Sequence, residues 1–129
     1  MSFLLDTHTF LWIFQAPERL PKKVRKIITD SDNTLFLSTA SGWEIGIKYH
    51  LGKLKLPQRP DDFVPVNTRD RNILSLEIEM EQALRAASLP AYHKDPFDRM
   101  LIAQAQLKKL TVLTGAAQFN RYDVSVFWS

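Results

Sequence analysis

The chain of 129 residues contains no cysteine. This absence excludes disulfides, thiolate zinc sites and cysteine nucleophiles, and it permits a reducing compartment. No apolar stretch approaches the roughly 20 residues that a membrane-spanning helix needs, and Asp6 follows the first apolar run too early for a signal peptide. We therefore expect a soluble, cytoplasmic protein that does not enter a membrane.

Linkers and repeats are also missing. No internal repeat, low-complexity tract or Gly/Ser-rich stretch divides the chain, and its seven prolines are dispersed. Hydrophobic residues make up 45% and charged residues 24%, as in ordinary globular domains. A chain of this length buries one core, so we expect a single domain over residues 1–129. The net charge of +3 tolerates a polyanionic partner but does not establish one.

Short apolar runs alternate with segments of helical periodicity. The expected strands are 3–5, 34–38, 72–75, 111–114 and 124–127. The expected helices are 7–13, 21–29, 41–51, 60–67, 77–87 and 96–110. This alternation predicts a parallel sheet covered by helices on both faces. Ligands of such sheets bind beyond the carboxyl ends of the strands.

Three acidic residues occupy positions suited to such a ligand site. Asp6 directly follows the first expected strand, while Glu44 and Asp98 lie on helix faces that are otherwise apolar. If they converge, a pair of carboxylates 4 Å apart repels by roughly 4 kcal/mol at an effective dielectric of about 20. Such a cluster takes up protons, pairs with buried cations or binds a metal ion. Oxygen ligands favour Mg²⁺ or Mn²⁺, and zinc is disfavoured because the three histidines show no ligand spacing.

Each acid also has a purely structural interpretation. Asp6 can cap the helix that follows it, and Ser41 with Glu44 matches a capping box. Asp95 matches a helix cap followed by a proline, with Asp98 as an acid in the first turn. Both interpretations stay open at this point.

Several motifs can be compared with known families as a set. They are LDTH at 5–8, SGWEIGIK at 41–48 with LGKL at 51–54, HKDPFDRMLIAQA at 93–105, and the closing stretch 113–128. Together they resemble PIN-domain ribonucleases, in particular the VapC-type toxins of bacterial toxin–antitoxin pairs. The resemblance implies a three-layer α/β/α sandwich with a central parallel sheet. It also implies Mg- or Mn-dependent hydrolysis of RNA, neutralisation by a cognate antitoxin protein, and a homodimer.

The resemblance implies roles for particular side chains. The metal-binding and catalytic acids are Asp6, Glu44 and Asp98. The supporting residues around them are Asp95, Arg99, Ser38 and Thr114. Arg99 points about 100° around its helix from Asp98, so we expect it to pair with Asp95 or to bind a phosphate.

One position departs from the family pattern Thr-x-Asp-x-x-Phe. The slot for a fourth acid, two residues after Thr114, holds Ala116. We expect a site of three carboxylates that holds one divalent ion well and a second poorly, unless Gln118 or Asp123 supplies an oxygen. Catalysis would then be weakened. The alternative function is a catalytically weakened PIN-like module that binds RNA or an antitoxin.

Other residues are weaker candidates. Aromatic residues at helical spacing are more often part of a hydrophobic core, and base stacking is the second interpretation for Trp12, Trp43 and Phe97. Candidates for a partner-binding groove are the loop 57–62 and the apolar residues Phe63, Val64 and Val66. An aspartate-nucleophile phosphotransferase, with Asp6 as nucleophile, is disfavoured because position 8, where that class repeats the acid, is His8.

Overall fold

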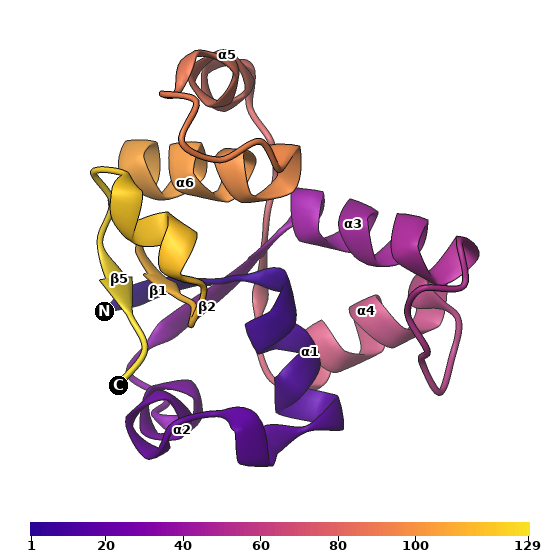
Figure 1. The fold of residues 1–129 in the computed structure, drawn as a ribbon. Helices are drawn as coiled ribbons and strands as arrows, with labels where there is room; N and C mark the ends of the chain where they lie inside the picture. The colour runs from indigo at the N-terminus through magenta and orange to yellow at the C-terminus, as the bar shows by residue number, and fades with distance from the viewer.

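A single five-stranded parallel sheet organises the protein, as the computed structural model of residues 1–129 shows (Figure 1). The strands are β1 (Ser2–Leu5), β2 (Thr34–Ser38), β3 (Leu74–Leu76), β4 (Thr111–Leu113) and β5 (Val126–Phe127). Their order is β3-β2-β1-β4-β5, and every neighbouring pair is parallel. Leu5 is in register with Leu37 of β2 and Leu113 of β4. The carboxyl ends of the three central strands therefore meet at one edge.

The helices lie between the strands in sequence, as the alternating pattern predicts. They are α1 (Thr7–Gln15), α2 (Lys22–Thr29), α3 (Thr39–His50), α4 (Pro60–Asp70), α5 (Met80–Ser88) and α6 (Pro96–Lys108). Two 3₁₀ segments, η1 (Pro17–Arg19) and η2 (Ala117–Arg121), complete the chain. The expected strands and helices are confirmed, with shifted ends. No helix combines the length and the apolar character needed to cross a membrane.

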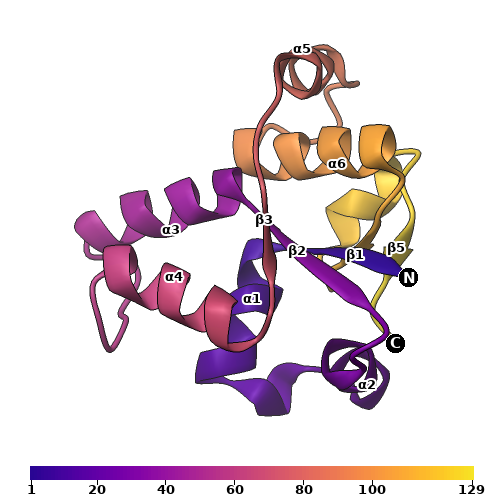
Figure 2. The ribbon, with the colours of Figure 1, turned by 180° about the vertical axis from the view of Figure 1, so that it is seen from behind.

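Two hydrophobic clusters lie on opposite faces of the sheet. Alternation along β1 sends Phe3 and Leu5 into one cluster and Leu4 into the other. The first cluster includes buried side chains of α1, α2, α3 and α4, and the second is built with α6 and η2. Figures 1 and 2 show α6 on one side of the sheet with α5 outside it, and α1, α2 and α4 on the other. The predicted three-layer α/β/α architecture is confirmed.

The start of α6 lies beside α3. The rings of Phe97 and Trp43 meet edge to face, with centroids 5.4 Å apart. This contact brings the first turn of α6, which contains Asp98, close to the second turn of α3, which contains Glu44.

Candidate functional site

Asp6 lies at the carboxyl edge of the sheet, between β1 and α1, and is 5% exposed. One carboxylate oxygen, Oδ1, accepts the Thr9 N–H at 2.6 Å, so Asp6 caps α1 as predicted. The other oxygen, Oδ2, accepts the hydroxyl of Thr114 at the end of β4. The cap interpretation is therefore correct. It leaves the carboxylate free lone pairs for a further ligand.

Glu44 is buried in the second turn of α3, at 3% exposure. Its Oε1 accepts the Thr7 hydroxyl at 2.7 Å, and its Oε2 pairs with Lys48 Nζ at 2.5 Å. The expected capping box of Ser41 and Glu44 is wrong, because α3 begins at Thr39. Glu44 is instead a buried acid that Thr7 ties to the start of α1.

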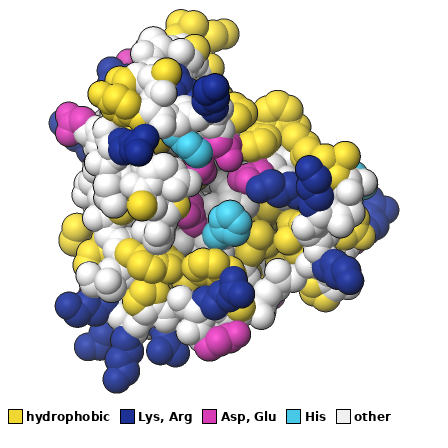
Figure 3. Space-filling model, in the orientation of Figure 1, with side chains coloured by type: hydrophobic (Ala, Val, Ile, Leu, Met, Phe, Trp, Pro, Cys, Tyr) yellow, Lys and Arg dark blue, Asp and Glu magenta, His cyan; other side chains and the backbone are white.

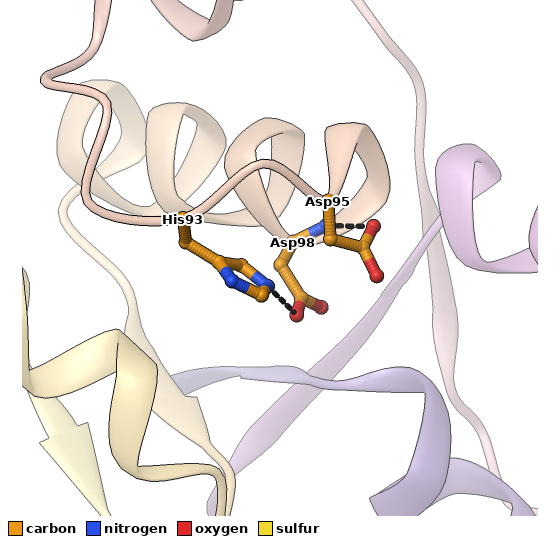
Figure 4. A group of neighbouring side chains, drawn as sticks. All are labelled: His93, Asp95 and Asp98. Carbon is orange, nitrogen blue, oxygen red and sulfur yellow. Dashed lines mark hydrogen bonds and ion pairs between the residues drawn. The ribbon is translucent and has the colours of Figure 1, made fainter.

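The third acid, Asp98, belongs to a group at the start of α6 (Figure 4). Asp95 caps this helix, as predicted, with Oδ1 accepting the N–H groups of Phe97 at 2.8 Å and Asp98 at 3.3 Å. Asp98 Oδ2 lies 3.1 Å from His93 Nε2 and accepts the Gln118 amide at 3.4 Å. Ligand atoms of His93, Asp95 and Asp98 lie within 4.8 Å of one another. These three side chains can hold a metal ion, whereas Asp6 and Glu44 are outside this group.

Negative charge accumulates around Asp98. Burial raises the pKa of its carboxyl group above the ordinary value, and the carboxylates of Asp95 and Glu44 raise it further. Hydrogen bonds from Gln118 and His93 to the ionised form oppose this rise. Asp98 and Glu44, far apart in sequence, thus interact electrostatically. A divalent cation bound among them would relieve the repulsion.

Arg99 differs from its expected arrangement. It pairs with no acid. Its guanidinium donates to five backbone carbonyls, those of Ala86 and Ala87 in the last turn of α5 and those of Leu89, Pro90 and His93 in the segment that leads to α6. The predicted ion pair with Asp95 is therefore wrong. The Arg99 guanidinium has five N–H donors, and the backbone carbonyls here offer them more acceptors than one carboxylate does. Arg99 positions the loop that carries His93.

Ser38 is the last residue of β2, and Thr114 directly follows β4. Ser38 is buried at the end of β2, and its hydroxyl accepts the Ala40 N–H at 3.0 Å, so it caps α3. The Thr114 hydroxyl also accepts the Ala116 N–H at 3.0 Å. Gln118 directs its amide nitrogen, an N–H donor, at Asp98 and not its oxygen. Asp123 is exposed and forms no ion pair with any residue.

Two residues at the site were missed by the sequence argument. His93 lies five positions before Asp98, a spacing that only the turn into α6 converts into a contact. Thr7 directly follows Asp6, yet its hydroxyl donates to Glu44 at 2.7 Å and lies within hydrogen-bond distance, 3.0 Å, of Ser41 Oγ. The motif LDTH contains Thr7, but nothing in the sequence indicated that Thr7 would bind Glu44 of α3.

A cavity of about 610 Å³ opens beside Asp6. Its lining residues are Asp6, His8, Trp12, Arg19, Gly115, Ala116 and Trp128. Figure 3 shows acidic and histidine side chains gathered around a hollow in the middle of this face, with Lys and Arg side chains at its rim. Ala116, the position where the motif has a fourth acid, therefore faces the same cavity as Asp6.

Comparison with known proteins identifies the fold family. The family model of the PIN domain matches residues 3–125. The chain belongs to the PIN domain family. A curated relative, Ribonuclease VapC16 of Mycobacterium tuberculosis, is 45% identical over 47 residues, which cover 36% of this chain and 33% of that protein. The match thus spans about a third of that relative's length.

Solved structures share the PIN domain architecture along the whole chain. One is VapBC2 from Rickettsia felis bound to a promoter DNA fragment, with a TM-score of 0.73, 14% identity and 100% coverage of both chains. Another is DNA-bound VapBC from Salmonella typhimurium, with a TM-score of 0.72, 20% identity and coverage of 98% of this chain and 97% of that chain. At these identities the likeness concerns the fold.

The donor set of this PIN domain fits a hard divalent cation. The acids are buried or half-buried, and the pKa of Asp98 is raised first by burial and then by two neighbouring carboxylates. Carboxylate oxygens suit Mg²⁺ and Mn²⁺, whereas an imidazole nitrogen such as that of His93 suits zinc and other transition metals. The expectation that no histidine is placed to bind a metal is therefore wrong, because the turn into α6 brings His93 beside Asp95 and Asp98. The side chains at the carboxyl edge are thus chemically suited to a metal ion.

Proposed function

We propose that this PIN domain is a metal-dependent ribonuclease, the toxin of a toxin–antitoxin pair, which hydrolyses phosphodiester bonds of RNA. The observation that carries the proposal is a cluster at the start of α6, where ligand atoms of His93, Asp95 and Asp98 lie within 4.8 Å of one another. Burial and the like charges of Asp95 and Glu44 raise the pKa of Asp98 in this cluster. Membership of the PIN domain family and the partial match to a ribonuclease support the same conclusion.

We propose Mg²⁺ or Mn²⁺ as the cofactor, with Asp6, Glu44 and Asp98 as its ligands. Asp98 is the member of this set that also belongs to the group with His93 and Asp95. When bound, the cation supplies a water of lowered pKa and neutralises charge on the scissile phosphate. The protein contributes carboxylate ligands whose orientations are already fixed by hydrogen bonds. Thr114 and the Thr9 N–H hold Asp6, whereas Thr7 and Lys48 hold Glu44.

The third ligand is held in the same way. His93 and Gln118 both engage Asp98 Oδ2, which leaves Oδ1 with no side-chain partner. Asp95, fixed by the N–H groups of the first turn of α6, stays beside it as a second negative charge. Each carboxylate therefore keeps its orientation without the cation, which lowers the cost of assembling the site.

Ala116 supports the finer proposal that activity is reduced. A methyl group occupies the slot where the motif places a fourth acid, in the cavity that Asp6 also lines. One cation would be held well and a second poorly. The same observation favours the second candidate function, a catalytically weakened PIN-like module that binds RNA or an antitoxin.

An apolar groove of about 690 Å³ between α3 and α4 supports an antitoxin partner. Its lining includes Trp43 and Leu51, which are 65% and 63% exposed, together with Ile47 and Val64. The candidate Phe63 does not belong to it, because its side chain is 2% exposed in the core. We propose that an apolar helix of the cognate antitoxin binds here.

A homodimer is also part of the proposal. Exposed apolar side chains on the edge strand β3 and around α5 offer a second surface, formed by Leu74, Ile78, Met80 and Leu84. Apolar groups of this size on an edge strand and a neighbouring helix suit burial against a second copy. The cytoplasm, where cellular RNA is translated, is the compartment that an RNA substrate implies.

Cleavage of an unstructured RNA by purified protein tests the function. We expect cleavage with Mn²⁺ or Mg²⁺ and none with EDTA. Asp6→Asn and Asp98→Asn should each lower the rate by at least about 100-fold. Asp32→Asn, at an exposed acid outside the site, should cleave like the wild type.

The outcomes separate the two candidate functions. Equal rates for the wild type and Asp98→Asn would overturn the ribonuclease proposal. RNA binding by a wild type that never cleaves would establish the binding module instead.

A further inference from the structure

The cavity beside Asp6 has aromatic walls. The rings of Trp12 and Trp128 lie 6.0 Å apart with their planes at 53°, and the His8 ring lies 6.0 Å from Trp12. Both tryptophans are half-buried, so part of each ring faces the cavity, and His8 is exposed. Well-packed aromatic residues of a core leave no space beside them, but these line about 610 Å³ of it. A cavity of this size accommodates a small planar group.

The cavity is lined by one acidic and one basic side chain, Asp6 and Arg19. Arg19 is exposed, forms no ion pair, and holds its guanidinium 5.4 Å from the centroid of the Trp12 ring. Asp6 is the one acid in the lining, and its oxygens already accept hydrogen bonds from Thr9 and Thr114. The cavity therefore has the carboxylate of Asp6 in its lining and also the positive charge of Arg19, which lies beside the Trp12 ring.

The Trp128 side of the cavity packs against the end of β4, where Thr114 binds Asp6. A Cβ on Gly115 would lie 2.8 Å from two atoms of the Trp128 indole, closer than side chains tolerate. Only glycine lets the indole approach the backbone here. Gly115 directly follows Thr114, whose hydroxyl donates to Asp6. The position of Trp128 is thus fixed relative to the acid.

We propose that this cavity is a nucleobase subsite, in which one unpaired base of single-stranded RNA stacks on Trp12 while Arg19 binds an adjacent phosphate. The inference rests on the proposed function, because it takes RNA as the substrate. Aromatic faces accept any base, and a nearby Arg adds a phosphate contact, so this subsite positions the RNA chain next to Asp6. Trp43, by contrast, packs on Phe97 outside this cavity.

Binding in EDTA tests the subsite separately from cleavage. A fluorescein-labelled, unstructured oligoribonucleotide is titrated with protein and followed by anisotropy. Trp12→Leu should raise Kd by about 10-fold, and Trp12→Phe, which keeps an aromatic face, should stay within about 2-fold of the wild type. An abasic oligomer of the same length should bind the wild type about 10-fold more weakly than the RNA does, and bind Trp12→Leu equally weakly.

The phosphate contact has its own readout. Arg19→Gln should reduce the slope of log K against log salt by about 0.7, the contribution of one contact to a single strand. Arg69→Gln, at an exposed arginine of α4 outside the cavity, is the control with the same change in charge and should leave that slope unchanged. Thermal unfolding verifies that each variant folds.

The binding and cleavage results test the nucleobase subsite and the ribonuclease proposal separately. Wild-type affinity in a folded Trp12→Leu, or equal affinity of the wild type for RNA and abasic oligomer, would overturn the nucleobase subsite. The abasic comparison needs no variant, so it decides even if Trp12→Leu unfolds. If these differences in Kd are found but Mn²⁺ supports no cleavage, the ribonuclease proposal fails while the subsite stands.

Discussion

Thr114 and Asp6 are joined by a hydrogen bond across 108 positions of sequence. The Thr114 hydroxyl donates to Asp6 Oδ2 and accepts the Ala116 N–H at 3.0 Å. Both residues follow central strands, β4 and β1, which pair in parallel. The hydroxyl therefore connects the acid to the segment that contains the exceptional Ala116.

Replacing Thr114 by valine keeps its shape but removes this hydroxyl. Because buried Asp6 and the half-buried Ala116 N–H both lose a partner, we expect a loss of about 1–3 kcal/mol in the free energy of unfolding, measured with urea. Mn²⁺ affinity, measured by calorimetry, should fall about 10-fold, since Asp6 loses its orientation. Thr114→Ser should restore both. A stable Thr114→Val with wild-type Mn²⁺ affinity would contradict this role.

Restoring the missing acid is a second test. In Ala116→Asp a carboxylate enters the cavity beside Asp6, so we expect Mn²⁺ affinity to rise by about 10-fold and RNA cleavage to increase. Without metal, the extra charge should lower the melting temperature, and Mn²⁺ should raise it again by mass action. Ala117→Asp, at the exposed next position, is the matched control and should do neither. Unchanged or weaker Mn²⁺ affinity would refute the assignment of this slot.

Asp98 predicts a specific dependence of stability on pH. Its pKa is raised in the folded protein, first by burial and then by Asp95, so the folded state binds this proton more tightly than the unfolded state does. The resulting stability is fully present below the unfolded-state pKa and is lost as pH rises through the folded-state pKa. Metal-free Asp98→Asn, which lacks the charge, should therefore melt at a higher temperature than the wild type at neutral pH.

The pH dependence of this difference in melting temperature tests whether the charge of Asp98 causes it. The difference between Asp98→Asn and the wild type should shrink as pH falls below the folded-state pKa, because the wild-type carboxyl group is then neutral as well. Asp32→Asn should show no such trend, since Asp32 is exposed. Differential scanning calorimetry in EDTA across this pH range measures both. A difference that stays constant with pH would show that charge is not its cause.

Arg99 should be sensitive even to a conservative change. Lysine lacks the planar fork of donors, so Arg99→Lys leaves several carbonyls of residues 86–93 without a partner. We expect a loss of about 2 kcal/mol or more in the free energy of unfolding, and faster hydrogen exchange in this segment. Arg85→Lys, where the arginine makes one exposed bond to Gln106, should cost less than about 0.5 kcal/mol.

Local patterns predicted most of the fold. The strand 34–38 was predicted with its observed ends, and the caps Asp6 and Asp95 lie where proline, charge and periodicity indicated. These features depend on neighbours within one turn. The start of α3 was misjudged because two possible caps, Ser38 and Ser41, lie close together, and the end of β2 decided between them.

The candidate site was predicted less completely. The acids Asp6, Glu44 and Asp98 were selected from their positions and from family likeness, and their role as a common ligand set stays a prediction. The structure groups Asp98 with His93 and Asp95. His93 and the carbonyl partners of Arg99 were not predicted. Their contacts depend on the path of the segment between α5 and α6, which has no regular periodicity to interpret.

The amino-acid sequence by itself determined the α/β alternation, the helix caps and the residue types available at the strand ends, because periodicity and capping are local properties of the chain. Tertiary structure alone decided that Thr7 would donate to Glu44, that Thr114 would donate to Asp6, and that Trp12 would meet Trp128 beside a cavity. Those contacts arise because parallel pairing brings the carboxyl ends of distant strands to one edge, and burial there forces each polar group to find a partner.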